Sequence, residues 1–331
     1  MNGFVEWVAP GVARIRVPNP AGLTRNVYLL EGPTCALVDG AHVHPASVQV
    51  LLRGLAALGK TPDDIAHLFL TDIMPDRMGA ALHPAFRYAQ VTAHPAAGVH
   101  ADYSIFTEGI RNELLTPLLR DRRLGGRVQS RAFGEALALA YGGEGRLRLD
   151  LPAPLQGHVG VGDRRMVPVP IGGLAHAHLL YRLEPDGLLF SGDVPGSPIE
   201  LPTLLRRRGA EPRRLVAELR RVPAAVTLLP ATGDAAPDAA RAAVDFIRAI
   251  VQVRDRLAAL LCGGPRELAT LLTLWTFGRP LSPLALARDT ATLLALVADL
   301  AAQGLVEEAA AEGVMAFRLA PRALQPAKRA A

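Results

Sequence analysis

One short segment limits the folds open to this chain more than any other, because it leads from an apolar run directly into a charged turn. Residues 65–70 form the apolar run, and residues 71–79 have the sequence Thr-Asp-Ile-Met-Pro-Asp-Arg-Met-Gly. A helical pattern over residues 46–58 comes before it and stops at Gly59, and residues 61–64 have the proline and acids typical of a helix N-terminus. This order predicts a βα arrangement that feeds a sheet, with polar side chains at the strand end.

Strand-like pairs lie at two other places, and each pair ends in an aspartate. The β-branched residues and the turns between the members of each pair predict short antiparallel strands. A separate Leu-Leu-Pro-Ala-Thr-Gly turn occupies residues 228–233. The segments are residues 12–17, 27–30 and 36–38, which lead to Asp39 and Gly40, and residues 179–183 and 188–192, which lead to Asp193.

Taken in order, these segments resemble the metallo-β-lactamase superfamily, whose motif at residues 71–79 is Thr-His-x-His-x-Asp-His-x-Gly. Thr71, Asp76 and Gly79 match the motif, and the three histidine positions hold other residues. The resemblance covers residues 5–235 and implies an α/β fold of four layers, αββα. It also implies that this fold and motif descend from hydrolases with a dinuclear metal site.

The resemblance implies where two zinc ions would bind, and none of those seven positions carries an imidazole. Zinc needs about four nitrogen, sulfur or carboxylate ligands. The first metal position would have Asp72, Met74 and Leu174, the second would have Asp76, Arg77 and Thr232, and Asp193 would bridge the two. We therefore expect a degenerate metal site that binds neither zinc nor another cofactor.

Arg77 is the substitution that changes the chemistry of this site most. Its guanidinium is positively charged at any working pH, so it cannot ligate a cation. We expect it to pair with Asp76 and Asp193, which would otherwise be buried carboxylates without a partner, and so to replace the charge of a metal ion. The alternative is an arginine that points outward on a slightly different turn. A Mg²⁺ or Ca²⁺ site made of Asp72, Asp76 and Asp193 is chemically allowed, but the charge of Arg77 opposes it.

Two pairs of histidines offer another route to a metal, each with a spacing of two residues. This spacing puts both rings of a pair on one side of an extended chain. A relocated metal would then take a further ligand from Asp39 or Asp72. The alternative is that these histidines are ordinary polar-face residues. The pairs are His42 with His44 and His176 with His178.

The sequence changes after residue 235 to long helices rich in alanine and leucine. Three predicted helices followed by a hairpin indicate a winged-helix-like α+β domain, and the resemblance is to the superfamily branch that carries such a domain. The helices are residues 238–262, 265–275 and 282–303, and the hairpin strands are residues 305–308 and 314–319. The predicted boundaries are residues 1–235 for the core domain, 236–262 for a connecting helix, 263–320 for the winged-helix-like domain and 321–331 for a tail.

The charge of the predicted winged-helix-like domain disfavours binding to DNA. Arg288 is the basic residue of its third helix, and the hairpin carries Glu307, Glu308 and Glu312. Contacts to phosphate need lysine or arginine at those places. We expect the domain to serve in packing or in forming a homodimer.

The whole chain has a formal net charge of +5, and its arginines concentrate in residues 120–127 and 206–221. Apolar residues lie between these arginines, which is typical of solvated helix faces; an anion-binding surface at the second stretch is the alternative. Helical segments near residues 105–120 and 129–140 belong to a region where the superfamily often has an insertion over the site.

Length and cysteine usage bound the class of protein. At 331 residues the chain exceeds the usual size of one domain. Cys35 and Cys262 give no disulfide framework, which favours a reducing compartment. Residues 1–20 lack the pattern of a secretory signal and no apolar run is long enough to span a bilayer, so we expect a cytoplasmic protein with no membrane partner.

These patterns favour a metal-free pseudoenzyme that binds a small molecule or a protein partner in the old cleft. One alternative is a hydrolase of a thioester, ester, lactone or phosphoester that uses Zn²⁺ or another divalent metal at a relocated site. The other is a nucleic-acid-associated protein that uses the arginine-rich stretches. The sequence has neither a Gly-x-Ser-x-Gly elbow nor a phosphate loop, so other enzyme classes lack support.

Overall fold

The computed structural model of the chain describes six stretches and a few single residues between them. The stretches are residues 4–20, 23–94, 157–171, 178–194, 226–309 and 314–321. They fall into two compact units, of which the first holds every stretch up to residue 247 and the second holds the chain from residue 248. The helices predicted near residues 105–120 and 129–140 and both arginine-rich regions lie outside these stretches. The predicted domain boundaries stay a prediction.

The first unit contains a mixed sheet of six strands in the order β1-β2-β3-β4-β5-β6. Neighbouring strands are antiparallel from β1 to β4 and parallel from β4 to β6. The strands predicted at residues 12–17, 27–30, 36–38 and 65–70 are confirmed, and the two edge strands β1 and β6 were not predicted. The strands are β1 (Val5–Ala9), β2 (Val12–Pro18), β3 (Thr24–Leu30), β4 (Cys35–Val38), β5 (Ile65–Phe69) and β6 (Gln90–Thr92).

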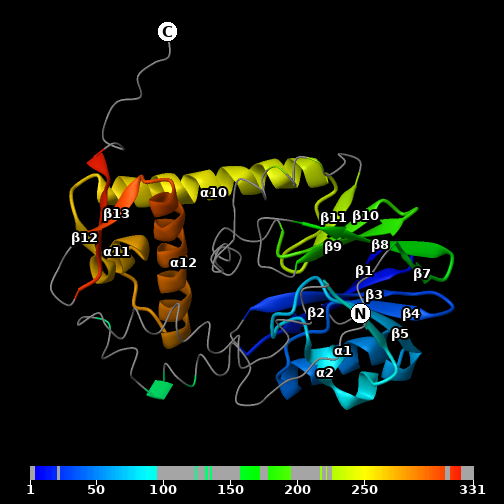
Figure 1. Cartoon of the computed structure of the whole chain (residues 1–331). Helices are drawn as coiled ribbons and strands as arrows, with labels where there is room; N and C mark the ends of the chain where they lie inside the picture. Colours follow the sequence, from blue (N-terminus) through cyan, green and yellow to red (C-terminus); the bar gives the residue numbers. More distant parts are fainter. Residues whose placement is uncertain are drawn as a thin grey trace, which may run out of the picture. The chain divides into compact units, whose positions relative to one another are not determined.

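Helix α1 (Pro45–Ala57) connects β4 to β5 and covers the outer face of this sheet (Figure 1). Its apolar side packs on β2, where a Cβ added to Gly54 would lie 2.4 Å from Cγ2 of Ile15. Only glycine therefore lets the helix approach the sheet this closely. The helix predicted over residues 46–58 is confirmed.

Short turns complete the segment around β5. The helix start predicted at residues 61–64 is a single 3-10 turn, η1 (Pro62–Asp64), because β5 begins at the next residue. After β5 the chain forms the short helix α2 (Gly79–Leu82) and a second 3-10 turn, η2 (Pro84–Phe86). The charged turn over residues 71–79 thus lies between the end of a buried strand and a short helix.

The second sheet has the strand order β11-β10-β9-β8-β7 and is also mixed. Only β10 and β11 are parallel, and the other neighbours are antiparallel. The antiparallel pair predicted at residues 179–183 and 188–192 is confirmed. The strands are β7 (Val159–Val161), β8 (Arg164–Pro170), β9 (Leu179–Glu184), β10 (Leu188–Gly192) and β11 (Thr227–Pro230).

An apolar core lies between the inner faces of the two sheets. The ring centroids of Tyr28 and Phe190 are 5.3 Å apart, as are those of Phe69 and Tyr181. Residues that alternate with these, such as Leu189, are buried on the outer face of the second sheet. That face is therefore covered too, as a four-layer arrangement requires.

The C-terminal elements follow the predicted order of three helices and a hairpin. One prediction needs correction: the helix expected over residues 265–275 begins at Leu268, because residues 266–267 form a strand, β12, that pairs with β14. The sheet order is β12-β14-β13. No helix in the described residues is both long and apolar enough for a membrane span. The elements are α10 (Ala239–Leu261), β12 (Arg266–Glu267), α11 (Leu268–Trp275), α12 (Pro283–Ala302), β13 (Val306–Ala309) and β14 (Ala316–Leu319).

Candidate functional site

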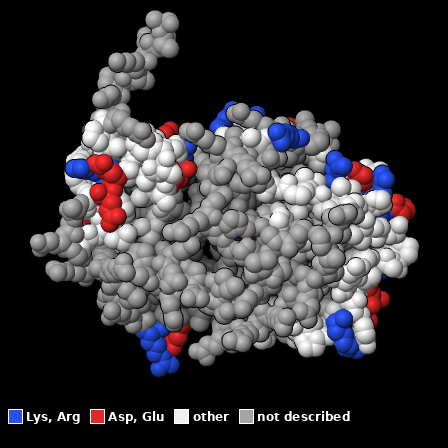
Figure 2. All heavy atoms as spheres, in the orientation of Figure 1, with Lys and Arg blue, Asp and Glu red and all other residues white. Residues whose placement is uncertain are grey.

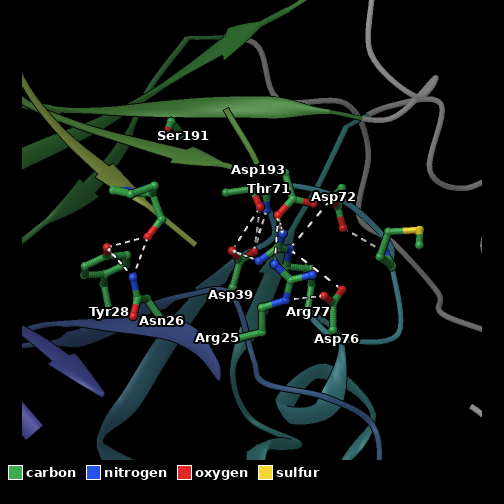
Figure 3. Close-up of polar contacts among 12 residues, drawn as sticks. Arg25, Asn26, Tyr28, Asp39, Thr71, Asp72, Asp76, Arg77, Ser191 and Asp193 are labelled. Carbon is green, nitrogen blue, oxygen red and sulfur yellow. Dashed lines mark hydrogen bonds and ion pairs between the residues drawn. The ribbon is translucent and has the colours of Figure 1, made fainter. Parts of the chain in front are cut away.

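Charged side chains at the strand ends of the first unit form one buried ion cluster (Figure 3). It contains four carboxylates and two guanidiniums, and none of the six residues is more than 9% exposed. The members come from the start of β3, from the ends of β4 and β10, and from the turn between β5 and α2. The ion cluster consists of Arg25, Asp39, Asp72, Asp76, Arg77 and Asp193.

Arg77 lies at the centre of the ion cluster and has no exposed surface. Its Nη2 donates to Oδ1 of Asp193, and its Nη1 lies 3.6 Å from Oδ2 of Asp39. Its Nε lies 3.6 Å from Oδ2 of Asp72 and 4.0 Å from Oδ1 of Asp76. The expected pairing of Arg77 with Asp76 and Asp193 is present, and the alternative of an outward-pointing arginine is wrong.

Arg25 is the second cation of the cluster, and no sequence pattern identified it. Its Nε lies 2.6 Å from Oδ2 of Asp76, and its Nη1 donates to Oδ1 of Asp193 at 3.2 Å. Oδ1 of Asp193 therefore accepts a hydrogen bond from each of the two guanidiniums. A count of charges could have identified it, because Arg77 alone cannot balance four buried carboxylates. Arg25 lies at the start of β3, in the strand pair that leads to Asp39.

Asp39 is fixed by the threonine of the motif. Its backbone has a left-handed φ of 62°, and its carboxylate accepts hydrogen bonds from the backbone N and from Oγ1 of Thr71, each at 2.9 Å. Burial raises the pKa of Asp39 to about 7, although the nearby charge of Arg77 acts to lower it. Asp39 is thus the member of the cluster whose charge changes near neutral pH.

Burial and ion pairing oppose each other at the other members. Burial alone would raise the pKa of Asp193, but Arg77 and Arg25 outweigh it and hold that pKa below its usual range. Burial acts to raise the pKa of Asp72 as well, but Arg77 and His178 together outweigh it and lower that pKa. Burial disfavours the charged form of Arg77, yet the surrounding carboxylates, Asp193 first, raise its pKa well above the usual value.

The charges of the cluster do not balance when every member is ionised. Four carboxylates and two guanidiniums leave an excess of two negative charges. Protonation of Asp39, whose pKa is about 7, reduces this excess as the pH falls through neutrality. The site is therefore a paired ionic core with residual negative charge.

The turn after β11, which matches the position of the family's late histidine, is attached to the strands that carry the cluster. The backbone N of Ala231 donates to the O of Gly192, directly before Asp193, at 2.7 Å. The backbone N of Asn26, directly after Arg25, donates to the O of Ala231 at 2.7 Å. Thr232 therefore comes directly after Ala231, whose backbone is hydrogen-bonded to the sequence neighbours of Asp193 and Arg25.

Four of the seven positions that the resemblance implied are members of the ion cluster, namely Asp72, Asp76, Arg77 and Asp193. Met74 lies beside them, and its backbone N donates to Oδ1 of Asp72 at 2.8 Å. Its side chain is partly exposed. Leu174 lies outside the described residues.

Two of the histidines proposed for a relocated metal are used in local hydrogen bonds. Nδ1 of His42 accepts from the backbone N of His44 at 3.0 Å. Nδ1 of His44 accepts from the backbone N of Ala46 at 3.2 Å and caps the start of α1. These bonds give each ring a structural role at the β4–α1 connection.

Of the second pair, His178 is described, and His176 lies outside the described residues. His178 is 2% exposed, and its Nδ1 lies 3.8 Å from Oδ2 of Asp72. Its Nε2 lies 3.1 Å from the O of Ser191. His178 therefore borders the ion cluster through Asp72.

The ion pairs and hydrogen bonds of the cluster limit its use in metal binding or in general-base catalysis. Across the part of the chain that the structure describes, no three or more His, Cys, Asp or Glu side chains are arranged to hold a metal ion. Carboxylates with a lowered pKa, such as Asp193, are weak bases. Asp39 has a pKa suited to a general base, but both of its oxygens accept from Oγ1 of Thr71 and it is 3% exposed.

Comparison with known proteins supports the fold. No protein-family model and no curated protein matches the chain. A solved metallo-β-lactamase family protein from Thermus thermophilus matches with a TM-score of 0.68 and 22% identity, over 94% of this chain and 100% of that one. A β-lactamase domain protein from Burkholderia ambifaria matches with a TM-score of 0.66 and 17% identity, over 96% and 94%. The chain therefore has a metallo-β-lactamase-like α/β fold with two mixed sheets.

Proposed function

We propose that this chain is a metallo-β-lactamase-fold protein that has lost its catalytic metal site and uses the old cleft to bind a small molecule or a protein partner. The observation that carries the proposal is the burial of Arg77, with no exposed surface, among four carboxylates. Because a guanidinium cannot give up its proton in a protein, this residue supplies a permanent positive charge where the family has a metal ligand.

The residues present do not fit a dinuclear zinc centre. Zinc sites are built from about four nitrogen, sulfur or carboxylate ligands, and the motif positions here offer carboxylates without a single imidazole. Arg77 already contacts Asp193, which bridges the metals in the family. At a separation of about 4 Å and an effective dielectric constant of about 20, two like unit charges repel by about 4 kcal/mol, and a divalent ion doubles this.

The two alternative functions have less support. A hydrolase with a relocated metal would need histidines free to converge, and His42 and His44 each use one ring nitrogen in a local hydrogen bond. A nucleic-acid-associated protein would need a continuous basic surface. The described basic and acidic side chains on the face drawn in Figure 2 are interspersed, and the arginine-rich residues 120–127 and 206–221 lie outside the described stretches.

We further propose that the C-terminal elements form a winged-helix-like domain that serves in packing or in a homodimer. The order of helix, strand, two helices and hairpin supports this, as does the sheet order β12-β14-β13. Leu293, Leu296 and Leu300 of α12 are buried, so this helix uses its apolar side for packing. Arg288 is the only basic residue in the sequence of α12, whereas contacts to DNA phosphates need lysine or arginine.

Metal analysis tests the central proposal. Full-length protein purified without chelator should contain far less than one equivalent of zinc, and added zinc should not raise its melting temperature. Stoichiometric, tightly bound zinc in the wild-type protein would contradict the proposal and favour the hydrolase alternative.

A variant with the family's ligands restored provides the matched control. It combines Asp72→His, Met74→His, Arg77→His, Leu174→His and Thr232→His, and it should bind zinc in the same assay. We expect it to hydrolyse thioesters, esters and lactones poorly, because the side chains that orient ligating histidines are missing. Efficient hydrolysis by this variant would mean that the cleft has kept its catalytic architecture.

A further inference from the structure

An exposed aromatic side chain follows the end of α11 on an unusual backbone. Phe277 is 78% exposed and has a φ of 53°, a left-handed conformation that favours glycine. The next residue, Gly278, has a φ of 71°, and its N donates to the O of Thr273 at 2.8 Å to close the helix. Glycine at position 277 would make the same turn without strain, so the turn itself does not require phenylalanine.

Arg256 of α10 holds this ring in place. Its guanidinium carbon lies 4.5 Å from the ring centroid of Trp275 and 4.5 Å from that of Phe277. Its Nη2 also donates to the O of Trp275 at 2.5 Å. These cation–π contacts and the hydrogen bond give the exposed ring a defined position, which reduces the entropy lost when a partner binds.

The positive charge around the ring is not balanced by acids. Within the described stretches, neither Arg256 nor Arg279 has a carboxylate partner, and Nε of Arg279 donates to the O of Thr276 at 3.2 Å. Arg254 and Arg318 of the same unit are paired, because Arg254 lies 3.1 Å from Asp299 and Arg318 contacts Glu307. Arg256 contacts the exposed ring and Arg279 follows that ring by two residues, so two guanidiniums without a carboxylate partner lie near it.

We propose that these residues form a docking surface for an acidic, apolar peptide segment of a partner protein. The aromatic–arginine surface consists of Arg256, Leu274, Trp275, Phe277 and Arg279, all in the second unit, and none belongs to the ion cluster. Leu274, which is 40% exposed, and Phe277 provide an apolar anchor. The two guanidiniums take carboxylates of the segment by paired hydrogen bonds.

The composition of the surface favours a protein segment over a nucleic acid. Tryptophan, aromatic residues and arginine are enriched at the points of protein interfaces that carry most of the binding energy. A phosphate backbone would need a longer basic path, and the exposed Asp255 lies next to Arg256 in the sequence of α10. Two arginines beside one apolar anchor match the size of a short peptide segment.

Selection from a random phage-displayed peptide library on the full-length chain tests the proposal. The recovered peptides should combine Asp or Glu with Leu, Phe or Trp. In fluorescence anisotropy with these peptides, Phe277→Gly and Arg256→Gln should each weaken binding by roughly tenfold or more. Phe277→Gly should leave the melting temperature unchanged or raise it, because glycine relieves the left-handed strain.

Matched controls separate this surface from general effects of charge and hydrophobicity. Val251→Ser removes another exposed apolar side chain of α10, and Arg318→Gln removes an exposed arginine that is paired; both should keep the wild-type affinity. Recovered peptides without acidic and apolar residues, or equal binding by Phe277→Gly, would overturn the proposal. So would a homodimer that Phe277→Gly dissociates in light scattering, or binding of a single-stranded oligonucleotide that this variant loses.

Discussion

Replacement of Arg77 by methionine should strongly destabilise the first unit. Methionine keeps most of the side-chain volume, so the main change is the loss of one positive charge with no exposed surface. The excess of negative charge in the ion cluster then rises from two to three. Removing one partner of a buried ion pair costs about 3–5 kcal/mol, because the other partner is left uncompensated.

Urea unfolding followed by circular dichroism at pH 7 measures this loss. With an m-value of about 2 kcal/mol per molar urea, the midpoint should fall by about 1.5–2.5 M. The loss should shrink as the pH falls below the unfolded-state pKa of 3.8, because Asp193 and Asp72 have lowered pKa values in the folded wild type. Their contribution to stability is present above that pKa and disappears below it.

A double-mutant cycle with Asp193→Asn provides the control for this prediction. Asp193→Asn removes the carboxylate that contacts Arg77 and keeps its shape. The double variant should lose clearly less stability than the sum of the two single variants, since neither group is then left unpaired. A near-neutral Arg77→Met variant, or a loss that is additive and independent of pH, would refute the role assigned to Arg77.

Three other predictions concern neighbouring features. Arg25→Gln should destabilise by about 1.5–3 kcal/mol in urea unfolding, since it removes charged contacts to Asp76 and Asp193; no change would mean that Arg77 alone balances the cluster. Asp39 has a folded pKa of about 7 against 3.8 unfolded, so its ionisation costs stability as the pH rises between these values. Asp39→Asn should therefore gain stability relative to the wild type between about pH 5 and pH 8, and parallel pH profiles would argue against the raised pKa. Gly54→Ala should cost about 1–3 kcal/mol, because the new Cβ would overlap Ile15; Gln49→Ala, at an exposed position of the same helix, is the control and should be nearly neutral.

The sequence predicted most of the fold because its signals are local. Apolar runs with turn residues at both ends located the central strands of both sheets. The motif over residues 71–79 located Arg77, and the strand pair that ends at Asp193 located its hydrogen-bonded partner. Arg25 was missed because its role depends on where the start of β3 lies relative to the end of β10, which no local pattern records. Strand β12 was missed for the same reason, since two residues become a strand only by pairing with β14.

The sequence predicted which side chains lie near one another at the site better than it predicted what each of them does. His42 and His44 have the spacing of a ligand pair, yet each accepts a hydrogen bond from a nearby backbone N. Only the path of the backbone after Asp39, with left-handed φ angles at Asp39 and Ala41, shows this. The sequence spacing cannot separate a ligand pair from two side chains that support a turn.

The double pairing at Asp193 has a consequence for the lifetime of the folded state. Its Oδ1 accepts from Arg25 and Arg77, which are 168 and 116 positions away in the sequence. We expect contacts over such separations to form late in folding and to contribute little to the transition state. Interactions absent from the transition state act mainly on the rate of unfolding. The ion cluster should therefore slow the separation of the two sheets and have little effect on the rate at which they assemble.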